Sequence, residues 1–169
     1  ELDAASAERG RAKVLGSLDA ALHRNKLTEA DRDAAVAQLH VTHDWDALAR
    51  CGADPKCVAW GELGLDNHYD KPPSDRQREV LAEQLDFLER QRAAGIVKPI
   101  VLHCREAFAD LIPILRATKL DPARMVFHCF TGSPADMRML LDFGACVSFT
   151  GVLTYKNAKD VQDAACLVP

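Results

Sequence analysis

The chain has 169 residues and a formal net charge of −4, with 48% hydrophobic and 27% charged residues. This composition favours one packed domain with at most a small appendage and excludes extensive disorder. The acidic balance excludes a globally basic surface, so a nucleic-acid substrate would need a metal ion or a local cationic cluster to hold its phosphates. All apolar runs are far shorter than the ~20 residues that cross a membrane. No signal peptide is apparent, and we expect a cytoplasmic location without membrane contact.

Residues 1–50 contain no proline and predict helices. Apolar residues at helical spacing between positions 14 and 22 indicate a first helix. Thr28 has the side chain of an N-cap, and a second helix is expected from there to about Leu39. Asp44 is expected to cap a short third helix. We therefore expect a helical segment over residues 1–50 and a separate α/β domain over residues 51–169.

Residues 51–169 alternate between short apolar runs and helical patterns. Because strands and helices alternate, we expect right-handed crossovers and a parallel sheet. The longest helix is expected to begin with Ser74 as N-cap and Gln77 as its capping-box partner, and to end at Gly95. The predicted strands are 57–61, 99–103, 125–130 and 145–149, and the predicted helices are 74–94, 107–118, 134–143 and 157–165.

Six cysteines occur without any C-x-x-C pair, which excludes a zinc ribbon and a thioredoxin motif. Several adjoin apolar runs, where a free cysteine behaves as a small hydrophobic residue. We expect reduced, buried thiols of structural importance only. The six are Cys51, Cys57, Cys104, Cys129, Cys146 and Cys166.

Three consecutive predicted strands each end near a side chain that can bind a metal: Glu62, His103 and His128. The carboxyl ends of parallel strands carry the functional groups of such sheets, so these side chains are expected to converge. Strand side chains alternate in direction. His103 therefore shares a face with Arg105, while Cys104 is expected to point away, and Cys129 likewise away from His128.

Two imidazoles and a carboxylate suit one or two divalent ions such as zinc or manganese. A bound ion lowers the pKa of its water and polarises a phosphoryl or carbonyl oxygen. Arg105 is expected to steady a substrate oxygen and Asp66 to orient the attacking water or accept its proton. Each residue also has an ordinary structural explanation: a hydrogen-bonded histidine, a solvated glutamate, a loop cap at Asp66 and an ion pair at Arg105. His68 and Tyr69 fall in a predicted exposed loop, where substrate contact is a secondary possibility.

Four ordered motifs, at residues 61–66, 101–107, 128–133 and 147–151, resemble blocks of the TatD family of metal-dependent deoxyribonucleases and phosphoesterases. The resemblance implies a TIM-barrel fold, a Glu62 ligand able to bridge two ions, and His103 and His128 as ligands of one of them. The chain departs from the family pattern, because the early His-x-His pair is absent and the sequence ends at Pro169 before the late Glu-Thr-Asp motif.

Residues 11–46 resemble instead a helical stretch of the NAD-binding domain of hydroxyacyl-CoA dehydrogenases. The Gly-rich dinucleotide fingerprint is absent, so NAD binding is not implied. We therefore expect a chimera of two unrelated fragments, with half a TIM barrel that a homodimer completes. The helical segment would lie at or near that interface, with His40, His43 or Asp44 available as ligands for the second subunit.

These observations predict a metal-dependent phosphodiesterase that uses metal-bound hydroxide, with a small phosphodiester such as a cyclic nucleotide, or DNA, as substrate. Two alternatives remain open from the sequence. One is a non-catalytic dimeric scaffold with a structural metal or none. The other is an amide or lactone hydrolase that uses the same ion.

Overall fold

The computed structural model describes residues 3–70 and 72–169, and the chain forms two compact units that meet between Arg50 and Cys51. The first unit contains α1 (Ala4–His23), α2 (Glu29–Ala37) and the start of α3 (Trp45–Ala53). The side chain of Thr28 accepts a hydrogen bond from the backbone N–H of Asp31, so the predicted cap of the second helix is confirmed. The ion pair of Arg32 with Asp19 (2.9 Å) joins α1 to α2.

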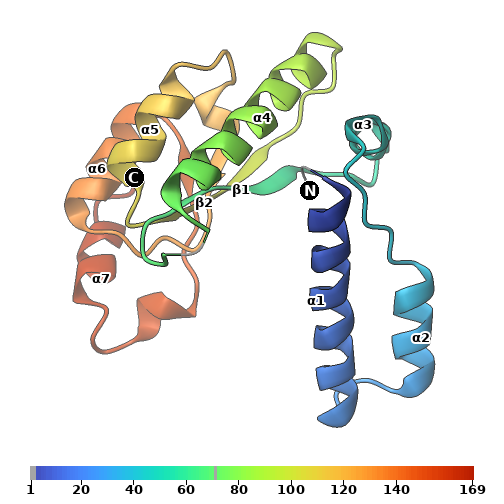
Figure 1. Ribbon diagram of the computed structural model, residues 1–169. Helices are drawn as coiled ribbons and strands as arrows, with labels where there is room; N and C mark the ends of the chain where they lie inside the picture. The colour runs from blue at the N-terminus through green and yellow to red at the C-terminus, as the bar shows by residue number, and fades with distance from the viewer. Residues whose placement is uncertain (1–2, 71) are drawn as a thin grey trace. The chain divides into compact units, whose positions relative to one another are not determined.

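The second unit is built on a parallel four-stranded sheet with the strand order β1-β2-β3-β4. Figure 1 shows α4 running beside β1 and β2, with α5 next to α4 and α6 beyond α5. The predicted α/β fold with a parallel sheet is therefore confirmed. The strands are β1 (Trp60–Asp66), β2 (Ile100–Arg105), β3 (Met125–Phe127) and β4 (Cys146–Val147); the helices are α4 (Ser74–Ala93), α5 (Phe108–Arg116), α6 (Pro134–Phe143) and α7 (Lys159–Ala165), with short 3-10 turns η1 (Pro122–Arg124) and η2 (Gly151–Thr154).

The two faces of this sheet differ in burial. Alternate residues of the strands are almost fully buried, with Leu65 of β1, Leu102 of β2 and Phe127 of β3 at most 2% exposed. The first strand packs against α4, whose predicted core residues Leu81 and Leu85 are 1% and 5% exposed, and Phe127 stacks against Phe108 of α5. The opposite face of the strands is only partly buried along β2 and carries the polar side chains. Helix packing therefore fixes one face and leaves the other available for chemistry.

All four strands are observed where predicted, but only the start of β3 coincides with its predicted boundary, and two of the differences have a clear local cause. The first strand begins at Trp60 rather than at residue 57, because the Cys57 N–H closes a turn onto the Asp54 carbonyl (3.0 Å). Val58 is consequently 77% exposed. The third strand ends at Phe127, since Cys129 adopts a left-handed backbone conformation (φ 54°) that breaks the extended chain.

The sheet of the described residues is an open one, with β1 and β4 at its edges. The predicted completion of this sheet by a second subunit stays a prediction. Among the helices that the structure describes, none has both the length and the apolar character that crossing a bilayer requires.

The prediction of buried thiols is wrong for most of the cysteines. Only Cys104 is buried, as its place on the helix-covered face of β2 requires, and all six are free. Cys129 has a left-handed backbone conformation, and its sulfur lies 3.1 Å from the Thr150 hydroxyl. Its predicted direction away from His128 stays a prediction. Cys51, Cys146 and Cys166 are exposed.

Alkylation should separate these thiols. Burial raises the pKa of the Cys104 thiol to about 12, so its thiolate fraction at pH 8 is roughly 1,000-fold below that of an unperturbed thiol. We expect iodoacetamide to modify Cys146 and Cys166 long before Cys104, as measured by peptide mass spectrometry on the folded chain. Equal alkylation rates at the three cysteines would contradict the burial of Cys104 on the helix-covered face of β2. Unfolding in urea should make the three rates similar.

Candidate functional site

Four of the predicted site residues form one contact network on the partly exposed face of the sheet. Oε1 of Glu62 lies 3.2 Å from Nδ1 of His103 and 3.4 Å from Nε2 of His128. The second ring nitrogen of His103 lies 2.8 Å from Oδ2 of Asp66. Three elements supply these side chains: β1 carries both carboxylates, β2 carries His103, and His128 directly follows β3. The carboxylate of Glu62 is thus shared by two imidazoles.

The pairing of β1 with β2 places His103 between the two acidic residues. Gly64 is the register partner of His103. A Cβ at Gly64 would lie 1.8 Å from the carbonyl oxygen of His103, and the φ of 150° is one that other residues rarely adopt. Only glycine lets the two strands approach this closely. The flanking positions Glu62 and Asp66 then share the face on which the His103 ring lies.

The Asp66 carboxylate is fully engaged. Oδ2 contacts His103, while Oδ1 accepts the backbone N–H groups of His68 (2.9 Å) and Tyr69 (3.3 Å). Burial acts to raise the pKa of Asp66, but the hydrogen bonds from His103 and from these two backbone groups outweigh it and hold the pKa below its ordinary value. Asp66 is therefore an ionised carboxylate that orients the His103 ring and starts the following loop.

Gln77 holds this junction from α4, a role that the sequence did not indicate. Its Oε1 accepts the Asp66 N–H (2.8 Å), and its Nε2 donates to the carbonyls of Asp66 and Pro72 (both 2.8 Å). The predicted capping box is wrong, since Pro73 is the N-cap of α4 and no side chain caps the helix. A glutamine at this position of a helix can either cap the helix or bind another segment, and the sequence spacing is the same in both cases. The decisive feature is that the end of β1 lies beside the start of α4.

Arg105 lies on the same face of β2 as His103, as predicted, and interacts with the loop after β1. Its Nη1 donates to the Tyr69 hydroxyl (3.2 Å), and its Cζ stands 5.0 Å from the centre of the Tyr69 ring. Sequence analysis placed Tyr69 in an exposed loop without identifying this pairing, because the two residues are 36 positions apart. The structure therefore puts a cation and an aromatic ring beside the acidic and imidazole groups.

The donor chemistry of the cluster fits a divalent cation. Two ligands bonded at the ~2.0–2.1 Å typical of zinc lie about 3.3 Å apart in tetrahedral coordination. The separations of Glu62 Oε1 from His103 and His128 are 3.2 and 3.4 Å. In the described residues, 3–70 and 72–169, no three or more His, Cys, Asp or Glu side chains are arranged so that they could hold a metal ion without moving. The cluster supplies a partial ligand set of the right elements.

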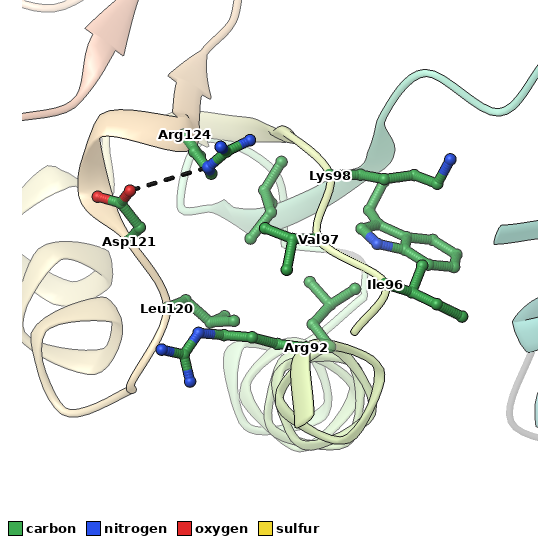
Figure 2. Close-up of a pocket in the computed structure, with 10 residues that line it drawn as sticks. Arg92, Ile96, Val97, Lys98, Leu120, Asp121 and Arg124 are labelled. Atoms are coloured by element: carbon green, nitrogen blue, oxygen red, sulfur yellow. Dashed lines mark ion pairs between the residues drawn. The ribbon is translucent and has the colours of Figure 1, made fainter. Parts of the chain in front are cut away.

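A cavity of about 270 Å³ lies elsewhere in the second unit, as Figure 2 shows. Trp60 and Ile100, the first residues of β1 and β2, contribute to its wall, so it lies at the amino ends of the strands. Arg124 at its rim pairs with Asp121 at 3.9 Å. The cluster around Glu62 lies toward the carboxyl ends of the strands, where functional groups of parallel sheets gather. The cavity at the amino ends is therefore a separate feature.

Comparison with known proteins identifies relatives along most of the chain. The family model described as TatD related DNase matches residues 18–169. The uncharacterized metal-dependent hydrolase YcfH of Escherichia coli K12 is 37% identical over 163 residues, covering 92% of this chain and 59% of YcfH. The human 3'-5' RNA nuclease TATDN2 is 39% identical over 118 residues, covering 68% of this chain and 15% of that protein.

A solved structure shows the same fold. The crystal structure of YJJV, a TatD homologue from Escherichia coli K12, superposes with a TM-score of 0.65 at 28% identity, over 80% of this chain and 51% of YJJV. The chain therefore spans little more than half the length of YcfH and YJJV. The family match also includes residues 18–50. The comparisons give no support to the predicted fusion with a dehydrogenase fragment, whose short helical patterns are common to many proteins.

Loss of the Gln77 side chain should destabilise the junction that holds Asp66. We expect Gln77→Ala to lower the free energy of unfolding by about 1–3 kcal/mol, because partly buried backbone groups lose their partners. Urea unfolding measures this change. Gln84→Ala on the same helix is the matched control and should cost less than about 0.5 kcal/mol. Equal effects of the two substitutions would show that Gln77 does not hold β1.

Proposed function

Because the chain belongs to the TatD-related DNase family, we propose that it hydrolyses phosphodiester bonds with a divalent metal ion held by Glu62, His103 and His128. The observation that carries this proposal is the shared contact of one Glu62 oxygen with both imidazoles, at 3.2 and 3.4 Å. A divalent ion bound there supplies a Lewis acid for a phosphoryl oxygen and activates water near neutral pH.

The hydrogen-bonding groups of the cluster support a cation. A neutral imidazole has one N–H donor and one lone pair, but both ring nitrogens of His103 face carboxylate oxygens. When a neutral ring donates its N–H to Asp66, its other nitrogen presents a lone pair to Glu62, and this lone pair and the Glu62 oxygen can both bind a cation. A cation held by His103 and Glu62 would use both of these lone pairs. The Asp66–His103 contact then fixes the ring as second-layer carboxylates do at metal-binding histidines.

Asp66 therefore has a different proposed role from the water-orienting base that the sequence predicts. Both of its oxygens are engaged by His103 and by backbone N–H groups. We assign it as a positioning residue that holds the His103 ring. Arg105 keeps its predicted role, because its guanidinium lies on the same face as His103 and carries donors that suit an anionic phosphodiester oxygen.

Nucleic acid is the proposed substrate class. The family description names a DNase and the human relative is named as an RNA nuclease. The chain carries a net charge of −4, so attraction of a phosphate backbone must come from the bound ion and from local cations such as Arg105. The predicted small phosphodiester, a cyclic nucleotide, is an alternative substrate, and bis(4-nitrophenyl) phosphate represents small phosphodiesters in the assay below.

Removal of the ligands should abolish both metal binding and hydrolysis. We expect His103→Ala and His128→Ala each to lower hydrolysis of bis(4-nitrophenyl) phosphate and of a labelled single-stranded oligonucleotide by at least ~100-fold. Elemental analysis after gel filtration should show a parallel loss of bound metal. Chelation with EDTA should reproduce the loss, and added zinc or manganese should restore the wild-type chain only.

His23→Ala is the matched control, since His23, the last residue of α1, is a histidine that is not among the predicted ligands. It should retain full metal content and turnover. Undiminished hydrolysis by chelated protein would overturn the proposal. A tightly held ion without any turnover would favour the scaffold alternative, and turnover of a lactone in preference to both phosphodiesters would favour the amide or lactone hydrolase.

A further inference from the structure

An exposed aromatic ring stands next to the cluster, in the loop that follows β1. Tyr69 is 57% exposed. The Arg105 guanidinium lies 5.0 Å from its ring centre and hydrogen-bonds its hydroxyl at 3.2 Å. The His68 ring meets it edge-on, with ring centres 4.8 Å apart and planes at 85°. The proposed hydrolysis uses Arg105 but gives Tyr69 and His68 no role.

The loop that presents Tyr69 is firmly anchored at its base. Asp66 accepts the backbone N–H groups of both His68 and Tyr69. The next residue, Asn67, donates its backbone N–H to the Arg105 carbonyl (2.9 Å) and its side-chain amide to Asp110 (2.8 Å). A segment held by this many bonds keeps an aromatic ring in water at a fixed orientation, and that arrangement is the one a stacking surface requires.

The acidic groups of the same region have other partners. Glu106 contacts Nδ1 of His68 at 2.8 Å, and Asp110 pairs with Arg78 at 2.9 Å. The Asn67 and Arg78 contacts hold the pKa of Asp110 below its ordinary value. Arg105 instead bonds to a neutral hydroxyl. Within residues 3–70 and 72–169 Arg105 forms no ion pair, so its positive charge is available to an anionic ligand lying over Tyr69.

The spacing relates this pair to the proposed reaction centre. Arg105 and His103 are two residues apart on the same face of β2, which corresponds to about 6.6 Å along the strand. One nucleotide can bridge that distance, with its phosphate at the cluster and its base over the ring. Bases are free to stack in this way at an unpaired end but not within a duplex.

We propose that Tyr69, braced by Arg105, is a stacking platform for the terminal nucleobase of a single-stranded nucleic acid whose phosphodiester lies at the Glu62–His103–His128 cluster. This inference rests on the proposed function, because it assigns the specificity of that same site. Stacking on an aromatic ring tolerates every base, since each one has a π face. Tyr69 is accordingly a positioning residue that selects unpaired ends without reading their sequence.

The test is equilibrium binding without turnover. Fluorescence anisotropy in EDTA at low ionic strength, where local cations such as Arg105 alone attract the phosphates, would measure the Kd of a labelled single-stranded oligonucleotide. The strand would carry either an intact base or an abasic site at its 3′ end, the end at which the name of the relative TATDN2 places cleavage. Tyr69→Leu should raise the Kd for the intact strand by about 5- to 150-fold, the range expected for loss of one base–aromatic stack. It should change the Kd of the abasic strand less than about twofold. Tyr69→Phe, which keeps the ring, should stay close to wild type.

Tyr155→Leu is the matched control, because Tyr155 is 58% exposed and lies at the end of η2. It should leave both Kd values unchanged. Equal weakening of both strands by Tyr69→Leu, or no weakening of either, would overturn the platform. Hydrolysis of bis(4-nitrophenyl) phosphate with no base-dependent binding would refute the platform and leave the proposed function standing. Base-dependent binding without metal-dependent hydrolysis would refute the proposed function and support the platform.

Discussion

The close pairing of β1 with β2 at Gly64 and His103 is the constraint on which the whole site depends. A side chain at Gly64 would overlap the His103 carbonyl. With no Cβ there, the two strands stay in register, and the His103 ring lies between the carboxylates of Glu62 and Asp66. Each ring nitrogen then meets a different acid. One side of the ring faces the proposed metal, and the other is held in place by Asp66.

In the second unit, one face of the sheet provides stability and the other face carries the reactive side chains. One face of the sheet packs almost water-free against the helices, through residues such as Leu102 and Phe127. The other face carries half-exposed charged groups, which are costly to bury and useful when a cation or an anionic ligand joins them. Gln77 links the two sides, because it extends from α4 to the backbone of Asp66. The rigidity of the helix-covered face is thereby transmitted to the acidic group that orients His103.

The net negative charge of the chain is compatible with a phosphate-bearing ligand near the cluster. Carboxylates near the cluster are engaged, Asp110 by Arg78 and Glu106 by His68. A phosphate-bearing ligand therefore meets Arg105 beside carboxylates that already have partners, one of which is the cation Arg78. A metal ion held by Glu62 and the two histidines would add the positive charge that an overall net charge of −4 does not provide.

The sequence by itself determined the fold class, the helix limits at Thr28 and Gly95, and the approximate place of Glu62, His103 and His128. Those features follow from local periodicity, capping chemistry and the rule that parallel strands bring their carboxyl ends together. The contacts between side chains that are distant in the sequence became known only from the tertiary structure. Gln77 became a brace for Asp66 instead of a helix cap, and Tyr69 met Arg105 across 36 residues. Such contacts arise from strand register and loop return, which no local pattern encodes.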